Sequence, residues 1–144
     1  MPIADLTRLI LQIPWKPGPA ADTNGPAVVS VTELTLDHAH HLPGAYRNGL
    51  RLRRDWPWTP GAVGLWGWTR PWQRRLGAVS VWRTDSDLRS FLILPEIVAL
   101  RQAYRSLGVV RSVKWTVPRF NPAEVWDDAV FQIDAWSQGY ATLR

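Results

Sequence analysis

The order of strand and helix patterns between residues 28 and 117 constrains this chain most. Alternating or 3.6-residue apolar periodicity marks, in turn, a strand, a helix, two strands, a capped helical segment and a last strand: Val28–Leu36, Leu42–Arg54, Gly61–Trp68, Leu76–Arg83, Thr84–Gly108 and Val109–Val117. The order β-α-β-β-α-β is that of the split βαβ, ferredoxin-like arrangement. It predicts an α+β sheet with helices on one face, and leaves the other face to a partner subunit, a nucleic acid or a ligand.

The ends of the chain extend this unit without adding a second one. At 144 residues the chain is one domain. Residues 1–26 read as an N-terminal arm and Pro/Gly loop, and residues 27–118 as the ferredoxin-like domain. Residues 119–144 hold a C-terminal helix and tail of the same domain, since Asn121 can cap a helix that has Pro122 at its first position and Glu124 at its third.

Composition narrows the classes of protein. The chain has no cysteine, hence no disulfide and no thiolate ligand or nucleophile. No apolar run reaches the ~20 residues of a membrane-spanning helix, and the short N-terminal apolar run lacks a basic leader and a cleavage site. We therefore expect a cytoplasmic protein without membrane contact. The formal net charge of +5 comes with an Arg, Ala, Pro and Trp bias that a GC-rich genome also produces, so it does not argue for an anionic partner.

Nucleic-acid binding deserves a direct test, because an RNA-recognition domain has the same strand order and stacks bases on sheet aromatics. Its third-strand signature is basic-Gly-aromatic-Gly/Ala-aromatic-Val-x-aromatic. The corresponding segment, Arg75–Trp82, has no glycine after the basic residue and neither internal aromatic. We expect no nucleic-acid partner. Phosphate-binding loops, serine-hydrolase elbows and paired metal-binding histidine motifs are also missing from the sequence.

Three residues are candidates for catalysis: His40, Tyr46 and Arg111. His40 stands in a histidine cluster before the first helix, where it is either a general base or part of a polar turn. The cluster spacing does not make a metal site by itself. Tyr46 lies on the apolar stripe of that helix, as a proton donor or as a core residue. Arg111 shares a strand face with apolar residues, so it needs a partner, which is either a carboxylate such as Glu33 or an oxygen of the substrate.

The ten tryptophans are unusual and several lie in strands. Indole rings suit a core, an interface or a pocket for a flat ligand. Trp66, Trp82 and Trp115 are therefore candidates for substrate binding, with sheet packing and a subunit interface as the alternative.

A longer pattern is more specific than any of these. Pro60-Gly61-Ala62 opens the second strand, Ser80-x-Trp82 closes the third, and Leu88-x-x-Phe91 and a late Trp115 follow. This pattern, over roughly residues 27–133, resembles a family of dimeric α+β barrel proteins related to spheroidene monooxygenase and the antibiotic-biosynthesis monooxygenases. The resemblance implies a homodimer whose two sheets pair into a barrel, with a pocket between sheet and helices in each subunit.

The resemblance also implies a function. We expect a monooxygenase-like enzyme that oxidises a hydrophobic, polyketide-like aromatic small molecule, with no cofactor or, alternatively, with haem. Many relatives carry a histidine six residues after the phenylalanine; here that position is Ile97, which argues against haem ligation and makes Ile97 a candidate substrate contact. A cyclase or dehydratase of the same fold, and a non-catalytic small-molecule-binding protein, remain as alternatives.

Overall fold

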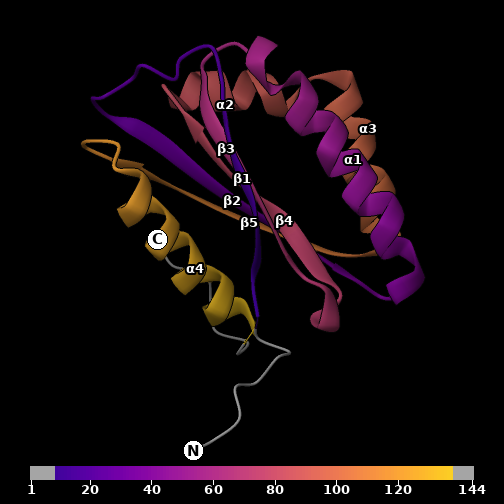
Figure 1. Cartoon of the computed structure of the whole chain (residues 1–144). Helices are drawn as coiled ribbons and strands as arrows, with labels where there is room; N and C mark the ends of the chain where they lie inside the picture. Colours follow the sequence, from indigo (N-terminus) through magenta and orange to yellow (C-terminus); the bar gives the residue numbers. More distant parts are fainter. Residues whose placement is uncertain (1–8, 138–144) are drawn as a thin grey trace, which may run out of the picture.

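A computed structural model describes residues 9–137 and shows one five-stranded antiparallel sheet (Figure 1). Its order is β1-β3-β4-β2-β5. The strands are β1 (Leu11–Pro17), β2 (Ala27–Leu36), β3 (Ala62–Arg70), β4 (Arg75–Trp82) and β5 (Gly108–Val117). The last four strands have the ferredoxin-like order, so the predicted α+β fold is confirmed.

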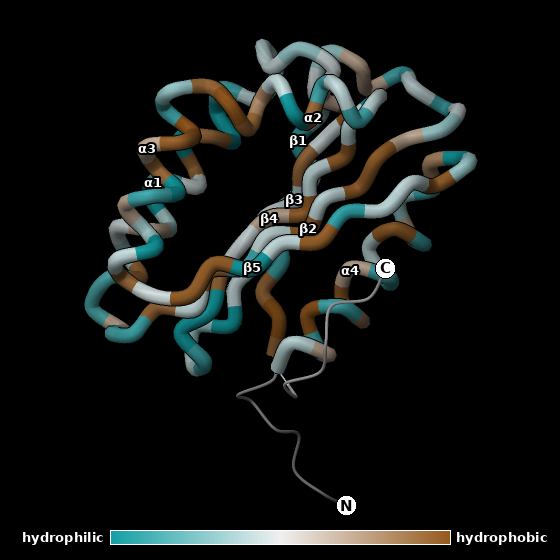
Figure 2. The backbone as a smooth tube through the Cα atoms, turned by 180° about the vertical axis from the view of Figure 1, so that it is seen from behind, coloured by the Kyte–Doolittle hydropathy of each residue, from teal (hydrophilic) through white to brown (hydrophobic). Residues whose placement is uncertain are grey.

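Helices cover both faces of this sheet (Figures 1 and 2). The helices on one face are α1 (Leu42–Asp55), α2 (Asp85–Leu92) and α3 (Pro95–Arg105); α4 (Pro122–Ser137) lies on the other. Pro95 divides the predicted second helical segment into α2 and α3, because proline at the first helical position begins a new helix. Within residues 9–137, no helix is long and apolar enough to cross a membrane.

Both predicted helix starts are capped as the sequence indicated. Asn121 Oδ1 accepts hydrogen bonds from the backbone N–H groups of Ala123 and Glu124, at 3.1 and 3.3 Å. At α2, Thr84 Oγ1 accepts from the Asp87 N–H at 3.1 Å and donates to the Asp87 carboxylate at 2.8 Å. These caps satisfy N–H groups that a helix terminus otherwise leaves unpaired.

Strand β1 is a part of the sheet that the sequence did not predict. We expected residues 1–26 to be an arm and loop, but β1 pairs with β3 along the sheet edge. Its prolines are tolerated because it is an edge strand, and the register shifts between Ile13 and Lys16, around Pro14. Trp15 rests on Gly64, where a Cβ would lie only 1.8 Å from the indole, so glycine is required for this contact.

Helix α4 covers the face that we expected a partner to cover. Apolar residues of α4 pack in one cluster with the valines of the central strands and the tryptophans of β3. The cluster includes Val29, Val31, Trp66, Trp68, Val79, Val81, Val125, Ala129, Ile133 and Trp136. The premise that helices can cover only one face was wrong, because the C-terminal helix returns across the sheet. A barrel formed by two sheets meeting on this face would require α4 to move away.

A buried ion pair fastens α4 to the sheet. Glu33 and Arg75 are 1% and 5% exposed, and the Arg75 guanidinium donates to the Glu33 carboxylate, to the Ser137 hydroxyl and to the Ile133 carbonyl, the last at 2.8 Å. Arg70 is also buried and pairs with Asp134. The end of α4 is thus held by two arginines from strands β3 and β4.

Arg111 was expected to be the buried cation, and this was wrong. The strand phase is correct, since Arg111 faces α4, but its side chain is exposed and donates one long hydrogen bond, 3.4 Å, to the Trp136 carbonyl. Glu33 stands opposite Arg111 in the register of β2 and β5, yet pairs with Arg75. The reason is position: Arg75 lies on a central strand under α4, whereas β5 is an edge strand.

Candidate functional site

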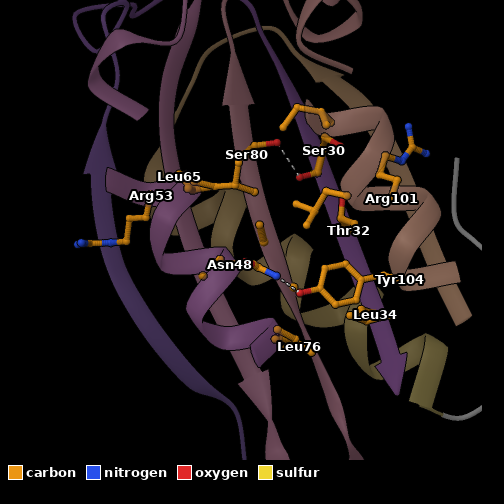
Figure 3. Close-up of a pocket in the computed structure, with 18 of the residues that line it drawn as sticks. Ser30, Thr32, Leu34, Asn48, Arg53, Leu65, Leu76, Ser80, Arg101 and Tyr104 are labelled. Atoms are coloured by element: carbon orange, nitrogen blue, oxygen red, sulfur yellow. Dashed lines mark hydrogen bonds between the residues drawn. The ribbon is translucent and has the colours of Figure 1, made fainter. Parts of the chain in front are cut away.

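A cavity of about 250 Å³ lies between the sheet and helices α1, α2 and α3 (Figure 3). Its walls are mostly apolar and include Leu34, Leu65 and Leu76 from the strands, Leu88 and Phe91 from α2, and Leu100 from α3. A mostly apolar, concave site with a few polar groups is the usual form of a small-molecule pocket.

Hydroxyl groups line the sheet side of this cavity. Ser30 and Thr32 on β2, Ser80 on β4 and Ser112 on β5 face it because alternate residues of a strand share a face. The strand registers place Ser80 opposite Ser30, and Ser112 opposite Thr32. These four hydroxyls, here called the floor hydroxyls, therefore lie side by side on three adjacent strands.

The floor hydroxyls differ in what they already bind. Ser80 Oγ accepts from the Trp82 indole at 3.0 Å and donates to the Ser30 carbonyl at 3.4 Å (Figure 3). Within residues 9–137, the hydroxyls of Ser30, Thr32 and Ser112 have no hydrogen-bond partner. Three hydroxyls are thus available to a ligand, and one is occupied.

A hydrogen bond joins two helices across the cavity. Asn48 of α1 donates from Nδ2 to the hydroxyl of Tyr104 on α3, and both residues line the wall (Figure 3). The bond bridges the two helices above the strands. Tyr46, two residues before Asn48 on α1, is 42% exposed and lies at the mouth with the half-exposed Leu50, about one turn further along the helix.

Charge is scarce in the wall. Arg53 and Arg101 are its charged residues; no Asp, Glu or His of residues 9–137 lines the cavity. Arg53 donates to the Pro14 carbonyl of β1 at 3.3 and 3.4 Å, and in Figure 3 its guanidinium points away from the floor hydroxyls, as does that of Arg101. The interior therefore offers hydroxyl, phenol and amide groups, without a carboxylate or imidazole base.

Two of the residues predicted from the sequence line this cavity: Tyr46 at its mouth and Ile97, which is buried. His40 lies outside the wall, in an exposed turn before α1 where its ring is 4.1 Å from that of His41 and 5.6 Å from that of His38. Among the described residues no group of metal-ligating side chains could hold a metal ion.

The other predicted site residues lie elsewhere. Arg111, Trp66 and Trp115 are on the α4 face, where Trp66 contacts the ring of Trp15 at 4.4 Å. Trp82 is buried behind one end of the cavity, between Trp56 and Phe91, and reaches the floor only through its hydrogen bond to Ser80. The structure therefore separates the predicted residues onto two faces of the sheet.

Sequence reasoning missed Ser30, Thr32, Asn48 and Tyr104 as cavity residues. A signal was present for the first two, since two hydroxyl residues interrupt the apolar face of β2 between Val28 and Leu34. The Asn48–Tyr104 pair joins residues of different helices, and no single-helix pattern indicates it.

Comparison of the sequence with protein-family models and with curated proteins finds no match. Comparison of the structure finds similar folds. One is a ferredoxin-fold protein of Listeria monocytogenes related to antibiotic biosynthesis monooxygenases (TM-score 0.52, 16% identity, 65% of this chain and 57% of that chain). Another is SnoaB, a cofactor-independent oxygenase from Streptomyces nogalater (TM-score 0.51, 19% identity, 67% of this chain and 97% of that chain).

A third is a monooxygenase-like protein of Listeria innocua (TM-score 0.51, 15% identity, 65% of this chain and 57% of that chain). The present chain thus spans a little over half of each Listeria protein and nearly all of SnoaB. At these identities the likeness shows the fold, and this fold is the one that the sequence pattern resembled.

Proposed function

We propose that this protein is a monooxygenase-like enzyme that oxidises a hydrophobic, polyketide-like aromatic small molecule without a dedicated cofactor. The observation that carries the proposal is the cavity, whose mostly apolar wall includes the hydroxyls of Ser30, Thr32 and Ser112, which no group of residues 9–137 binds. The fold that it shares with SnoaB, a cofactor-independent oxygenase, supports the proposal.

The chemistry asks little of the protein. The acidic O–H group of a phenolic or enolic substrate loses its proton to water at the open mouth, and the resulting anion, whose charge is shared with a neighbouring carbon, adds the electron pair of that carbon to O₂. The peroxide takes up a proton and then loses water, so that this carbon gains one oxygen atom as a carbonyl and two hydrogens leave as water, with no external reductant. The protein must hold the substrate away from bulk water and donate hydrogen bonds to the oxygen that carries the negative charge.

Haem does not fit the cavity wall well. Among the common axial ligands histidine, cysteine, methionine and tyrosine, the wall formed by residues 9–137 offers only tyrosine. Tyr46 is half exposed at the mouth, and the hydroxyl of Tyr104 already accepts a hydrogen bond from Asn48. Ile97 occupies the position at which the sequence pattern would place a histidine. We derive no step through haem, and expect hemin titration to give no sharp stoichiometric change in the Soret band.

The second candidate is a small-molecule-binding protein without catalysis. The observation that favours it is the wall itself, which offers no carboxylate or imidazole base within the described chain. The same observation counts against a cyclase or dehydratase, which must abstract a proton beside a carbonyl with a positioned base.

Oxygen uptake distinguishes these candidates. Purified protein is mixed with polycyclic phenols and hydroxyquinones in an oxygen-electrode cell, and products are identified by mass spectrometry. Turnover with one oxygen atom gained per product supports the oxygenase. Saturable binding without oxygen uptake supports the binding protein instead.

A matched pair of variants shows whether the cavity is the site. Leu50→Trp places a bulky indole ring at the mouth of the cavity, and Leu94→Trp makes the same change at an exposed residue outside the wall. We expect Leu50→Trp to abolish oxygen uptake and Leu94→Trp to keep it, with equal melting temperatures. Equal activity in both variants would move the site away from this cavity.

A further inference from the structure

The unpartnered floor hydroxyls are the starting point. Ser30 is 8% exposed and lines the cavity, and no group within residues 9–137 forms a hydrogen bond with its hydroxyl. Thr32 and Ser112 add two more such hydroxyls at neighbouring positions of β2 and β5. Ser80 contrasts with them, because the backbone and Trp82 already satisfy its hydroxyl. Ser30, Thr32 and Ser112 can thus each donate a hydrogen bond to an oxygen atom of a bound ligand.

The chemistry of the wall restricts the chemical class of ligand that can supply this oxygen atom. A carboxylate ligand would be expected to meet an inward-pointing cation, but the guanidinium groups of Arg53 and Arg101 point away from the floor hydroxyls (Figure 3). A substrate that needed a strong base would meet none in the described wall. An acidic hydroxyl group on the substrate meets neither difficulty, since it can release its proton to water at the open mouth.

We infer that the cavity binds an aromatic phenol or enol and that the Ser30 and Thr32 hydroxyls hold its oxygen as an oxyanion. This inference rests on the proposed function and specifies its substrate class. The O–H bond of the ligand ionises, the proton goes to solvent water, and the electron pair delocalises into the ring. The O–H groups of Ser30 and Thr32 then each donate a hydrogen bond to the oxygen of the ligand. Hydrogen bonds to an ionised acceptor are stronger than those to a neutral one.

The probe for this inference is 2-naphthol, whose naphtholate form absorbs at longer wavelength than the neutral form. The pKa of the bound probe is measured by absorbance under nitrogen in wild type, Ser30→Ala and Thr32→Val. Apolar walls favour the neutral form in every variant, so the comparison between variants is the relevant quantity. We expect each variant to raise the pKa of the bound probe by about one unit, the equivalent of one charge-assisted hydrogen bond.

Controls separate this effect from a change of structure. Thr32→Ser keeps a hydroxyl and should restore the wild-type pKa of the bound probe. Thr116→Val makes the same change on β5 at a residue outside the wall and should leave that pKa unchanged. Thermal melting verifies that each variant folds. If Thr32→Val does not fold, the pKa of the bound probe in Ser30→Ala is compared with that in wild type and in Thr32→Ser, and this comparison still tests the inference.

The inference is overturned if 2-naphthol does not bind wild-type protein, if Leu50→Trp does not weaken its binding, or if the pKa of the bound probe is the same in Ser30→Ala, Thr32→Val and wild type. The measurement contains no oxygen, so it is independent of the oxygenase proposal. Shifted pKa values without oxygen uptake by any phenol would sustain the binding inference and refute the proposed function. Oxygen uptake that is unchanged in Ser30→Ala and Thr32→Val would support the proposed function and refute the binding inference.

Discussion

At the scale of single residues, Arg75 and Arg111 present the same guanidinium group in two environments. Arg75 lies on the central strand β4 under α4, where it is the buried partner of Glu33. Arg111 lies on the edge strand β5, where its side chain is exposed and donates one long hydrogen bond to the Trp136 carbonyl. Burial of an arginine therefore depends on which strands are neighbours in the sheet, and the alternating pattern within one strand does not contain that information.

Arg75 and Arg111 therefore form a matched pair for mutation. Arg75→Met leaves the Glu33 carboxylate buried without its partner, and should lower the free energy of unfolding by about 3 kcal/mol. Arg111→Met removes an exposed side chain with one long hydrogen bond and should change it by no more than about 0.5 kcal/mol. Urea denaturation followed by fluorescence measures both; equal losses would contradict the assignment of the ion pair.

Asp85 provides a residue-scale prediction of pH dependence. A hydrogen bond from Lys114, with the positive charges of Lys114 and Arg89, lowers the pKa of Asp85 from the ordinary 3.8. Because the pKa is lower in the folded state, this interaction stabilises the fold above pH 3.8 and is lost as the pH falls through the folded-state pKa. Lys114→Met should raise the pKa of Asp85 in an NMR titration, whereas the distant Lys16→Met should not.

At the scale of elements, the capped helices could be predicted and the edge strand could not. The caps at Thr84 and Asn121 are local signals, contained within four residues. Strand β1 carries Pro14 and Pro17, which lower the expectation of a strand, and it becomes stable only through its pairing with β3 and the contact of Trp15 with Gly64. Those partners are about fifty residues away in sequence.

Asn121→Ala tests the cap of α4. The change removes the acceptor for the N–H groups of Ala123 and Glu124, and should lower the free energy of unfolding by about 1 kcal/mol. Asn121→Asp keeps an acceptor and should cost much less. Chemical denaturation of the three proteins measures the difference, and an unchanged midpoint in Asn121→Ala would show that α4 does not need this cap.

At the scale of the whole molecule, α4 changes what the resemblance implies. Two-sheet barrel pairing needs an open sheet face, and in this protein Val125, Ala129 and Ile133 of α4 occupy it. The homodimer stays a prediction. With α4 in this position, the two subunits would contact each other through a surface other than the sheet face that α4 covers. Sedimentation of the full chain at micromolar concentration measures the oligomeric state.

Removing α4 tests its role as a cover. A chain ending at residue 120 would expose the tryptophan-rich cluster on strands β3, β4 and β2, and apolar patches of that kind promote association. We expect the shortened chain to self-associate or to bind the apolar dye anilinonaphthalene sulfonate strongly, and the full chain to bind far less of it. Equal dye binding by both chains would mean that α4 contributes little to shielding the sheet.

The order of the strands also bears on solubility over long times. Unpaired strand edges can template addition of further chains, and proteins commonly guard them with prolines, irregular pairing or charges. Here the outer edge of β1 contains Pro14 and Pro17 beside a register shift, and β5 carries Arg111 and Lys114. Each border of the sheet thus has its own protection against fibril growth. The proline border keeps its protection at high salt, which screens the charges that protect the border at β5.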